Sequence, residues 1–246
     1  MDRMLYTAMN TASNIGLAQA NNANNLANSH TPGFKADLDA LKSLPVYGPG
    51  HATRVVAQDQ QPGSDLRSGP IRQTGRDLDL AVSGEGWLTV LSETGQEAYS
   101  RRGDLRIDVS GLLIDGAGRA VLGEGGPITV PPHEGLVIGR DGSISIQPLG
   151  QAANTLAVID RIRLVSAEPT QLEKGLDGLF RSRDGQPLPA DAGVEVFSGA
   201  LESSNVNAVE SMVKMIELAR SFEAQVKLMK LAQDNDAATD RLLRQS

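Results

Sequence analysis

The spacing of apolar residues divides this chain into three parts. Near the N-terminus, Met1, Leu5, Ala8 and Ala12 recur every three or four positions, which predicts a helix over residues 1–29. Seven asparagines lie within that stretch, and asparagine is a mediocre helix former. We therefore expect this helix to depend on packing for its stability.

The first helix is predicted to end at a Thr-Pro-Gly sequence. Pro32 fixes its own backbone and disfavours helical backbone at the residue before it. Beyond this break, the spacing of Leu38 and Leu41 predicts one more short helix over residues 35–44. Residues 53–75 are predicted to form an extended and irregular stretch, because Pro-Gly and Gly-Pro pairs interrupt them.

From Asp77 onward the apolar period changes to two, which is typical of β-strands. Turn sequences such as Asp115-Gly116 and Asp141-Gly142 separate the strands. Short strands without helical patterns between them indicate an antiparallel β domain. The apolar segments expected in strands are Leu78–Val82, Trp87–Leu91, Tyr99, Leu105–Val109, Leu112–Ile114, Val121–Leu122, Ile128–Val130, Leu136–Ile138, Ile144–Ile146, Leu156–Val158, Ile162–Leu164 and Val194–Phe197.

A second long helix is predicted to run almost to Ser246. Ser204 or Asn205 is its expected N-cap, and Glu210 places a carboxylate in the early turns. Apolar residues cover a wider arc of this helix than the single stripe needed to dock on one domain, which predicts several helical neighbours. One face carries Val209, Met212, Val213, Ile216, Ala219 and Val226, and another carries Met215, Leu218, Phe222 and Met229.

These patterns predict an α+β fold. Discontinuous N- and C-terminal helices, in residues 1–34 and 201–246, are expected to pack as a coiled-coil-like assembly domain. Residues 35–76 are expected to form a connector, and residues 77–200 a central, mainly antiparallel β domain.

The composition narrows the class of partner. A formal net charge of −7 lacks the basic footprint of nucleic-acid binding, so no nucleic-acid partner is expected. No run approaches the roughly 18 apolar residues of a membrane span. The N-terminus lacks the basic and apolar regions of a secretory signal peptide. The chain has no cysteine, which excludes a disulfide framework and a thiolate metal site.

Residues capable of catalysis or metal binding form no constellation in the sequence. His30, His51 and His133 lack metal-ligand spacing and are expected in loops or at the surface. Carboxylate pairs such as Asp77 and Asp79 are expected on the solvated face of a strand. A Ser-x-x-Lys pattern in the C-terminal helix has no companion motif. We therefore expect neither an enzyme nor a bound cofactor or metal.

Three blocks of this sequence resemble the bacterial flagellar rod and hook proteins. They cover most of the chain and stand in the order that the family has. Within the family, the opening of the chain resembles the proximal-rod members most. The motifs that carry the resemblance are Ala-Asn-Asn-Leu-Ala-Asn at 23–28, Thr-Pro-Gly-Phe-Lys at 31–35, Asp-Leu-Ala-Val at 79–82, Gly-Glu-Gly-Trp at 84–87, Tyr-Ser-Arg-Arg-Gly-Asp at 99–104 and Leu-Glu-Ser-Ser-Asn-Val at 201–206.

The resemblance implies a structural subunit of the flagellar basal-body rod, which polymerises through its terminal helices into the axial drive shaft that transmits torque. It implies that the partners are copies of the chain, other proximal- and distal-rod proteins, and the flagellar type III export apparatus. It also implies a periplasmic location, export without a cleavable signal peptide, and no direct insertion into the membrane.

Two alternatives stay open at this point. A distal-rod subunit is the alternative within the family, and an extracellular β-rich binding module with helical oligomerisation ends is the alternative from another class. The residues expected at the assembly interface are Leu5, Ala8, Ala12, Ile15, Asn24, Asn25, Leu26, Ala27, Asn28, Thr31, Gly33, Phe34, Ser204, Asn205, Val206, Val209, Met212, Met215, Ile216, Arg220, Phe222 and Glu223.

Overall fold

The computed structural model describes residues 2–45, 55–151 and 155–243. The fold is α+β, with a helix at each end of the chain and mostly antiparallel strands between them, as predicted. Contacts divide the chain into two units. The helical unit comprises Met1–Ser29, Asp37–Asp65 and Val206–Ser246, and the β unit comprises His30–Ala36 and Leu66–Asn205.

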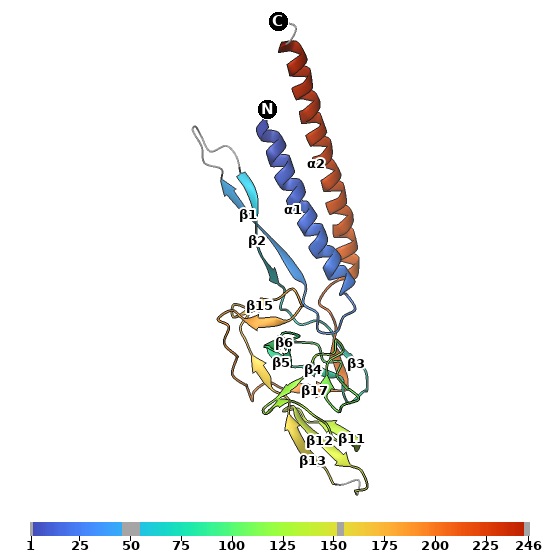
Figure 1. The fold of residues 1–246 in the computed structure, drawn as a ribbon. Helices are drawn as coiled ribbons and strands as arrows, with labels where there is room; N and C mark the ends of the chain where they lie inside the picture. Colours follow the sequence, from blue (N-terminus) through green and yellow to red (C-terminus); the bar gives the residue numbers. More distant parts are fainter. Residues whose placement is uncertain (1, 46–54, 152–154, 244–246) are drawn as a thin grey trace. The chain divides into compact units, whose positions relative to one another are not determined.

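The helical unit contains both long helices, α1 (Asp2–Ala27) and α2 (Ala208–Leu243). They lie side by side and run in opposite directions (Figure 1). The α1 face that packs in this unit carries small side chains, because Ala8 and Ala12 are both buried. Small residues let two helix axes approach closely. The amide of Asn22 crosses the contact and donates a 2.7 Å hydrogen bond to the Ser211 carbonyl.

The predicted short helix over residues 35–44 is wrong. These residues belong to β1 (Asp37–Pro45), which pairs antiparallel with β2 (Val55–Ser64) in the helical unit. The pairing register shifts between Leu38 and Ala40, so a bulge interrupts the period of two expected for a strand. The three-residue spacing of Leu38 and Leu41 therefore follows from the bulge and does not indicate a helical turn.

The β unit consists of short antiparallel strands. A five-stranded sheet has the order β14-β5-β6-β16-β15, a three-stranded sheet has the order β11-β12-β13, and the remaining strands form pairs. The antiparallel β domain predicted from the sequence is thus confirmed. Its strands are β3 (Ile71–Gln73), β4 (Leu80–Val82), β5 (Gly86–Leu91), β6 (Glu97–Ser100), β7 (Arg106–Ile107), β8 (Leu113–Ile114), β9 (Leu122–Gly123), β10 (Gly126–Pro127), β11 (His133–Ile138), β12 (Ser143–Pro148), β13 (Ala157–Arg161), β14 (Leu164–Ser166), β15 (Leu172–Lys174), β16 (Phe180–Ser182), β17 (Val196–Ser198) and β18 (Ala200–Glu202).

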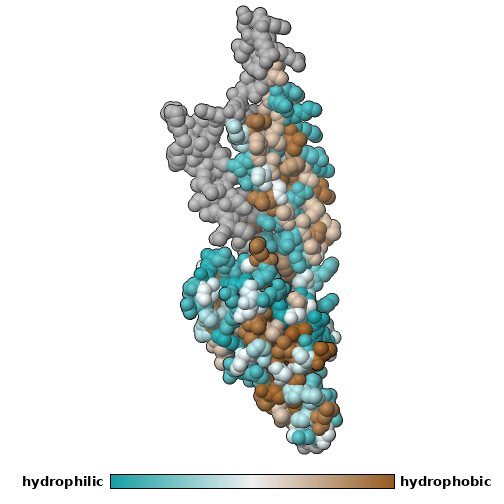
Figure 2. Space-filling view, viewed as in Figure 1, coloured by the Kyte–Doolittle hydropathy of each residue, from teal (hydrophilic) through white to brown (hydrophobic). Residues whose placement is uncertain are grey.

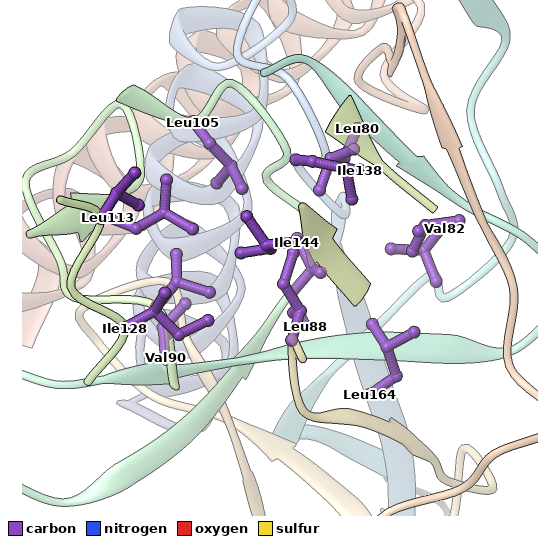
Figure 3. Packing of buried hydrophobic residues seen from close by; sticks show 14 of the residues in the cluster. Leu80, Val82, Leu88, Val90, Leu105, Leu113, Ile128, Ile138, Ile144 and Leu164 are labelled. Carbon is purple, nitrogen blue, oxygen red and sulfur yellow. The ribbon is translucent and has the colours of Figure 1, made fainter. Parts of the chain in front are cut away.

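Aliphatic side chains fill the main core of the β unit. Leu80, Leu88, Val90, Leu105 and Ile144 from different strands and loops point toward one another and are inaccessible to solvent (Figure 3). This core rests on leucine, isoleucine and valine because the chain has few aromatic residues. Removing such groups from water is the main force that holds strands this short together.

A second, smaller core cluster contains most of the buried aromatic surface. The rings of Trp87 and Phe180 have centroids 4.6 Å apart, in a tilted arrangement. Tyr99 belongs to the same cluster and is 1% exposed. Trp87 is 2% exposed, so both rings lie in the interior of the strand segments in which the sequence places them.

Asp79 is buried, contrary to the expectation of a solvated position, whereas Asp77 is exposed as expected. The reason is that β4, which follows directly, is buried at all three of its positions. A strand covered on both faces offers no solvated side for alternating polar residues. The Asp79 carboxylate is instead paired with the Arg76 guanidinium at 3.2 Å.

The two units group the segments differently from the predicted domains. Asp37–Asp65, expected in the connector, belongs to the helical unit. His30–Ala36 belongs to the β unit, although residues 30–34 were expected with the N-terminal helix and residues 35–36 in the connector. Hydrogen bonds account for the second assignment, because Gly33 donates to the Glu202 carbonyl at 2.8 Å. The domain boundaries of the assembly-competent subunit stay a prediction.

Candidate assembly site

Exposed apolar side chains follow the C-terminal helix. α1 covers one side of α2, where Ser211 is buried and Met215 is half-buried. Away from that side, Val209 is 71% exposed and Ile216 is 57% exposed. Figure 2 shows such hydrophobic residues at the surface of the helices. Among the α2 residues whose side chains the structure describes, the exposed large apolar ones are Val209, Met212, Val213, Ile216, Phe222, Val226, Leu228 and Leu231.

The structure separates the predicted interface residues by exposure. Some of them already serve the fold of their own unit and are buried, namely Ala8, Ala12, Asn25, Gly33 and Ser204. Others are half-buried, namely Leu5, Ile15, Leu26, Asn28, Thr31, Phe34, Asn205, Val206 and Met215. The exposed members are Asn24, Ala27, Val209, Met212, Ile216, Arg220, Phe222 and Glu223.

The asparagine-rich end of α1 makes hydrogen bonds to its own last turn and to the start of β1. The Asn25 side chain donates to the Asp37 carbonyl and accepts from the Asp37 amide, both at 2.8 Å. A side-chain amide thus completes the backbone pairing at the start of β1. The Asn28 side-chain amide and the Ser29 hydroxyl donate to the Asn24 and Leu26 carbonyls in the last turn of α1, in addition to the backbone amides that these carbonyls already accept.

The N-cap of α2 is Asn207, so the expectation of Ser204 or Asn205 is wrong. The Asn207 side-chain oxygen accepts hydrogen bonds from the amides of Val209 at 3.1 Å and Glu210 at 3.4 Å. Asn205 is engaged within the β unit, where its side-chain oxygen accepts from the Ala36 amide at 2.8 Å.

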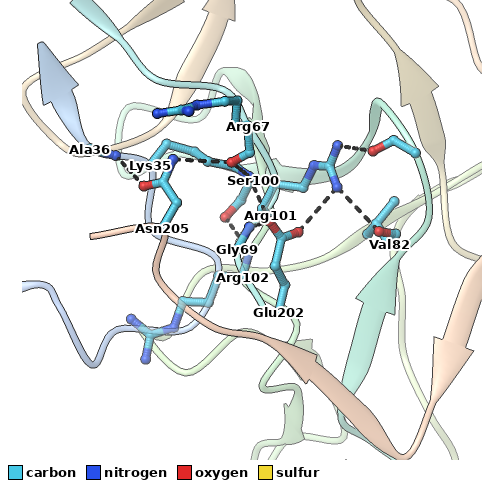
Figure 4. A network of polar contacts seen from close by, with 11 residues as sticks. Lys35, Ala36, Arg67, Gly69, Val82, Ser100, Arg101, Arg102, Glu202 and Asn205 are labelled. Atoms are coloured by element: carbon cyan, nitrogen blue, oxygen red, sulfur yellow. Dashed lines mark hydrogen bonds and ion pairs between the residues drawn. The ribbon is translucent and has the colours of Figure 1, made fainter. Parts of the chain in front are cut away.

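A buried ionic cluster lies in the β unit where the sequence motifs meet. We call it the polar junction, and it consists of Lys35, Arg101, Glu202 and Asn205 (Figure 4). Lys35 Nζ lies 2.6 Å from Glu202 Oε1, and Arg101 lies 3.2 Å from Glu202 Oε2. All three charged side chains are at most 2% exposed. Charges that are buried to this extent need partners of the opposite sign.

Each group around Glu202 has more than one partner. Lys35 Nζ also donates to the Arg67 carbonyl at 2.9 Å, and Glu202 Oε1 accepts from the Gly69 amide at 2.9 Å. The guanidinium of Arg101 donates to the Val82 carbonyl at 3.2 Å. The charged groups of the junction therefore bind backbone from two separate stretches of the β unit, residues 67–69 and Val82.

The junction contains two cations and one carboxylate. Burial lowers the pKa of the Arg101 guanidinium from its ordinary value, and the charge of Glu202 opposes this change. Arg101 lies 5.1 Å from the centre of the Trp87 ring, where its charge meets the electron-rich face. Its Nε has no hydrogen-bond partner within the described part of the chain.

The first and last segments of the β unit are joined at this junction. The Asn205 amide donates to the Phe34 carbonyl at 3.3 Å. Lys174 Nζ donates to the Lys35 carbonyl at 2.7 Å and lies 4.1 Å from the centre of the Phe34 ring. Gly33 through Ala36 are therefore each held by at least one contact.

Lys35, Arg101 and Glu202 occur in the motifs recognised in the sequence but not among the predicted interface residues. The sequence feature that could have indicated them is that each of the three motifs at 31–35, 99–104 and 201–206 contains a charged residue. Such motifs tend to lie close to the core, so a cation in two of them and an anion in the third indicate a pair.

The described residues outside the polar junction form no cluster of metal-binding side chains. No group of three or more His, Cys, Asp or Glu side chains in these ranges is placed to hold a metal ion. His30 is exposed and His133 is half-buried, whereas His51 lies outside the described residues. Within the described residues, no helix is both long enough and apolar enough to cross a membrane.

Comparison with known proteins relates both ends and the middle of the chain to one family. Residues 198–242 match the C-terminal region of the flagellar basal body rod FlgEFG proteins, and residues 81–146 match the D1 domain of the flagellar hook proteins FlgE/F/G. The flagellar basal-body rod protein FlgF of Salmonella typhimurium is 42% identical over the full length of both chains. This chain belongs to the flagellar basal-body rod protein family.

Further members of the rod family show how far the similarity extends. The flagellar basal-body rod protein FlgF of Caulobacter vibrioides is 31% identical over 98% of this chain and 96% of its own. The rod protein FlgG of Buchnera aphidicola is 28% identical over 83% of this chain and 86% of its own. The FlgF relatives thus match more of the chain than this FlgG relative does.

Proposed function

We propose that this rod-family chain is a structural subunit of the proximal flagellar rod and that it polymerises through its terminal helices. The observation that carries the proposal is the full-length similarity to proteins named FlgF, combined with apolar residues on the solvent side of α2. A helix that serves only its own unit needs about one apolar stripe. The additional stripe of α2 provides the surface for neighbouring helices.

In this proposal, copies of the chain and related rod proteins pack their terminal helices together in a coiled-coil-like arrangement. Identical contacts repeated without closing generate a helical tube. Each large apolar side chain that becomes fully buried contributes about 1.5–3 kcal/mol, so several per subunit offset the loss of freedom on assembly. Torque then passes along the tube through these helices.

The proposal includes a route and a place. The subunit leaves the cytosol through the flagellar export apparatus and assembles in the periplasmic part of the basal body. The distal rod is not favoured, because the FlgG relative is less similar and matches less of the chain. The extracellular binding module with helical oligomerisation ends is not favoured either, since Trp87 and Tyr99 are buried and offer no exposed ring to a ligand.

The test uses a charge on the exposed apolar side of α2. Val213→Asp in a strain without its own copy of the gene is expected to abolish rod assembly and motility. The purified Val213→Asp monomer is expected to melt like the wild type, because Val213 is 50% exposed in the single chain. Glu217→Gln, on an exposed position of the same helix, is the matched control and is expected to assemble. Normal rods with Val213→Asp would refute assembly through this face.

A further inference from the structure

The charges of Lys35 and Glu202 do not contribute equally to the electrostatic balance of the polar junction. With two cations around one carboxylate, loss of the Lys35 charge leaves a neutral pair of Arg101 and Glu202. Loss of the Glu202 charge removes the carboxylate that both buried cations contact. Uncompensated buried charge is the costly state, so the two changes have unequal consequences.

The hydrogen bonds of the junction also indicate that loss of Lys35 is less costly than loss of Glu202. Without Lys35, Glu202 Oε1 still accepts from the Gly69 amide at 2.9 Å. The Arg67 carbonyl still accepts from the Asn205 side chain at 3.1 Å. Both of these acceptors thus keep another donor when Lys35 is replaced.

What Lys35 adds to these bonds is an ionic connection between the first segment of the β unit and Glu202. It is the charged side chain by which Gly33–Ala36 reaches Glu202 and the Arg67 carbonyl. The other bonds between this segment and Glu202–Asn205 involve backbone or neutral groups, such as the bond from the Gly33 amide to the Glu202 carbonyl. The bond from Lys174 Nζ to the Lys35 carbonyl connects the segment to β15 instead. Bonds between charged groups are roughly twice as strong as neutral ones.

We propose that Lys35 is a positioning residue that anchors the segment Gly33–Ala36 to the segment Glu202–Asn205, and that this anchor keeps the two segments joined when the subunit carries torque. These segments are where the chain leaves α1 for the β unit and leaves the β unit for α2. Tension that enters the β unit directly from α1 or from α2 along the chain reaches one of these two segments first. The mechanical part of this proposal rests on the proposed function as a rod subunit.

Amide hydrogen exchange on the purified full-length chain tests the anchor itself. In Lys35→Met, the amides of Gly33 and Asn205 are expected to exchange about tenfold faster or more, because one charge-assisted connection between their segments is lost. The core amides of Thr89 and Leu91 are expected to keep their wild-type rates. Unchanged exchange at Gly33 and Asn205, or an equal increase at all four amides, would overturn the proposal.

A matched variant separates anchoring from general destabilisation. Arg163→Met removes another partly buried ion pair of the β unit, in which Arg163 lies 3.0 Å from Glu97. This pair has no contact with Gly33–Ala36, so the exchange of Gly33 and Asn205 is expected to stay within about twofold of the wild type. Faster exchange at both amides in Arg163→Met would show that they merely report the stability of the unit.

Swimming under load tests the mechanical consequence. In a strain without its own copy of the gene, Lys35→Met is expected to lose speed more steeply than the wild type as the medium is made more viscous. If the strain without the gene swims normally, the proposed function fails. If the strain needs the gene and Lys35→Met follows the wild-type viscosity curve, the anchor proposal fails while the function stands.

Discussion

Gly33 lies directly against the backbone of Arg101 in the β unit. A Cβ atom built on Gly33 would be 2.2 Å from both the carbonyl carbon and the carbonyl oxygen of Arg101. Its φ of 67° is also a conformation that only glycine adopts readily. The segment that follows α1 thus approaches the backbone just after β6 so closely that the contact leaves no room for a side chain at Gly33.

Gly33→Ala is therefore expected to destabilise the β unit by about 3 kcal/mol or more, since backbone strain and overlap with rigid atoms add together. Urea unfolding of the full-length chain measures the loss. Gly118→Ala is the control, because Gly118 has a φ of 89° but open space around its Cβ position. That variant is expected to lose only about 1 kcal/mol. Equal losses would show that overlap with Arg101 contributes nothing.

Glu202→Gln is expected to lower the free energy of unfolding by about 3 kcal/mol or more, because Lys35 and Arg101 then share a site without their carboxylate. Lys35→Met is expected to cost less than half of that amount. Chemical denaturation of both purified variants gives the comparison. The control is Glu97→Gln, at a more exposed ion pair with Arg163, where about 1 kcal/mol is expected. A larger loss for Lys35→Met than for Glu202→Gln would contradict the charge balance described for the junction.

Asn25→Asp is expected to detach the start of β1 within the helical unit. The Asn25 amide donates to the Asp37 carbonyl, and an aspartate at this position has no donor and repels that carbonyl. We expect the exchange of the Asp37 amide to rise and the helical unit to lose about 1–3 kcal/mol. Asn24→Asp, on the neighbouring exposed position, introduces the same charge and is expected to leave the Asp37 amide protected. Protection of Asp37 in both variants would argue against a structural role for this pair.

Tyr99 gives the β unit a defined sensitivity to alkali. Burial raises the pKa of its phenol to about 12, above the ordinary value of 10.0. The unfolded tyrosine releases its proton first as the pH rises, so stability falls between these two values, by up to about 1.4 kcal/mol per pH unit. The measurement is the difference in unfolding free energy between wild type and Tyr99→Phe from about pH 8 to about pH 12, a range that begins below the ordinary pKa and reaches the raised one. A difference that does not change with pH would contradict the assignment.

The sequence alone predicts the elements whose pattern is local. The period of apolar residues identifies both terminal helices and most of the strands around Leu88 and Ile144, because burial of one face or of both faces leaves a regular trace. It fails at β1, where the bulge between Leu38 and Ala40 breaks the period. Local pattern is thus reliable for element type until the backbone departs from regular geometry.

The candidate site is less predictable, since it depends on residues far apart in the chain. Lys35 and Glu202 are 167 residues apart, and Asn205 is diverted from capping α2 by its bond to Ala36. Periodicity also does not distinguish apolar residues used within the subunit from those left for a neighbour. Ala8 is buried within the single chain, whereas Ile216 is exposed, although both belong to apolar stripes.

The junction of first and last segments also determines when the β unit becomes compact. A ribosome delivers the chain from its N-terminus, so Lys35 emerges 167 residues before its carboxylate partner. During that time the ammonium group stays hydrated, and closing so long a loop is slow compared with forming any one hairpin. The last contacts of the unit form only after Asn205 has been synthesised. Synthesis of the segment Glu202–Asn205, rather than the folding of any single strand, therefore sets the earliest moment at which the β unit can close.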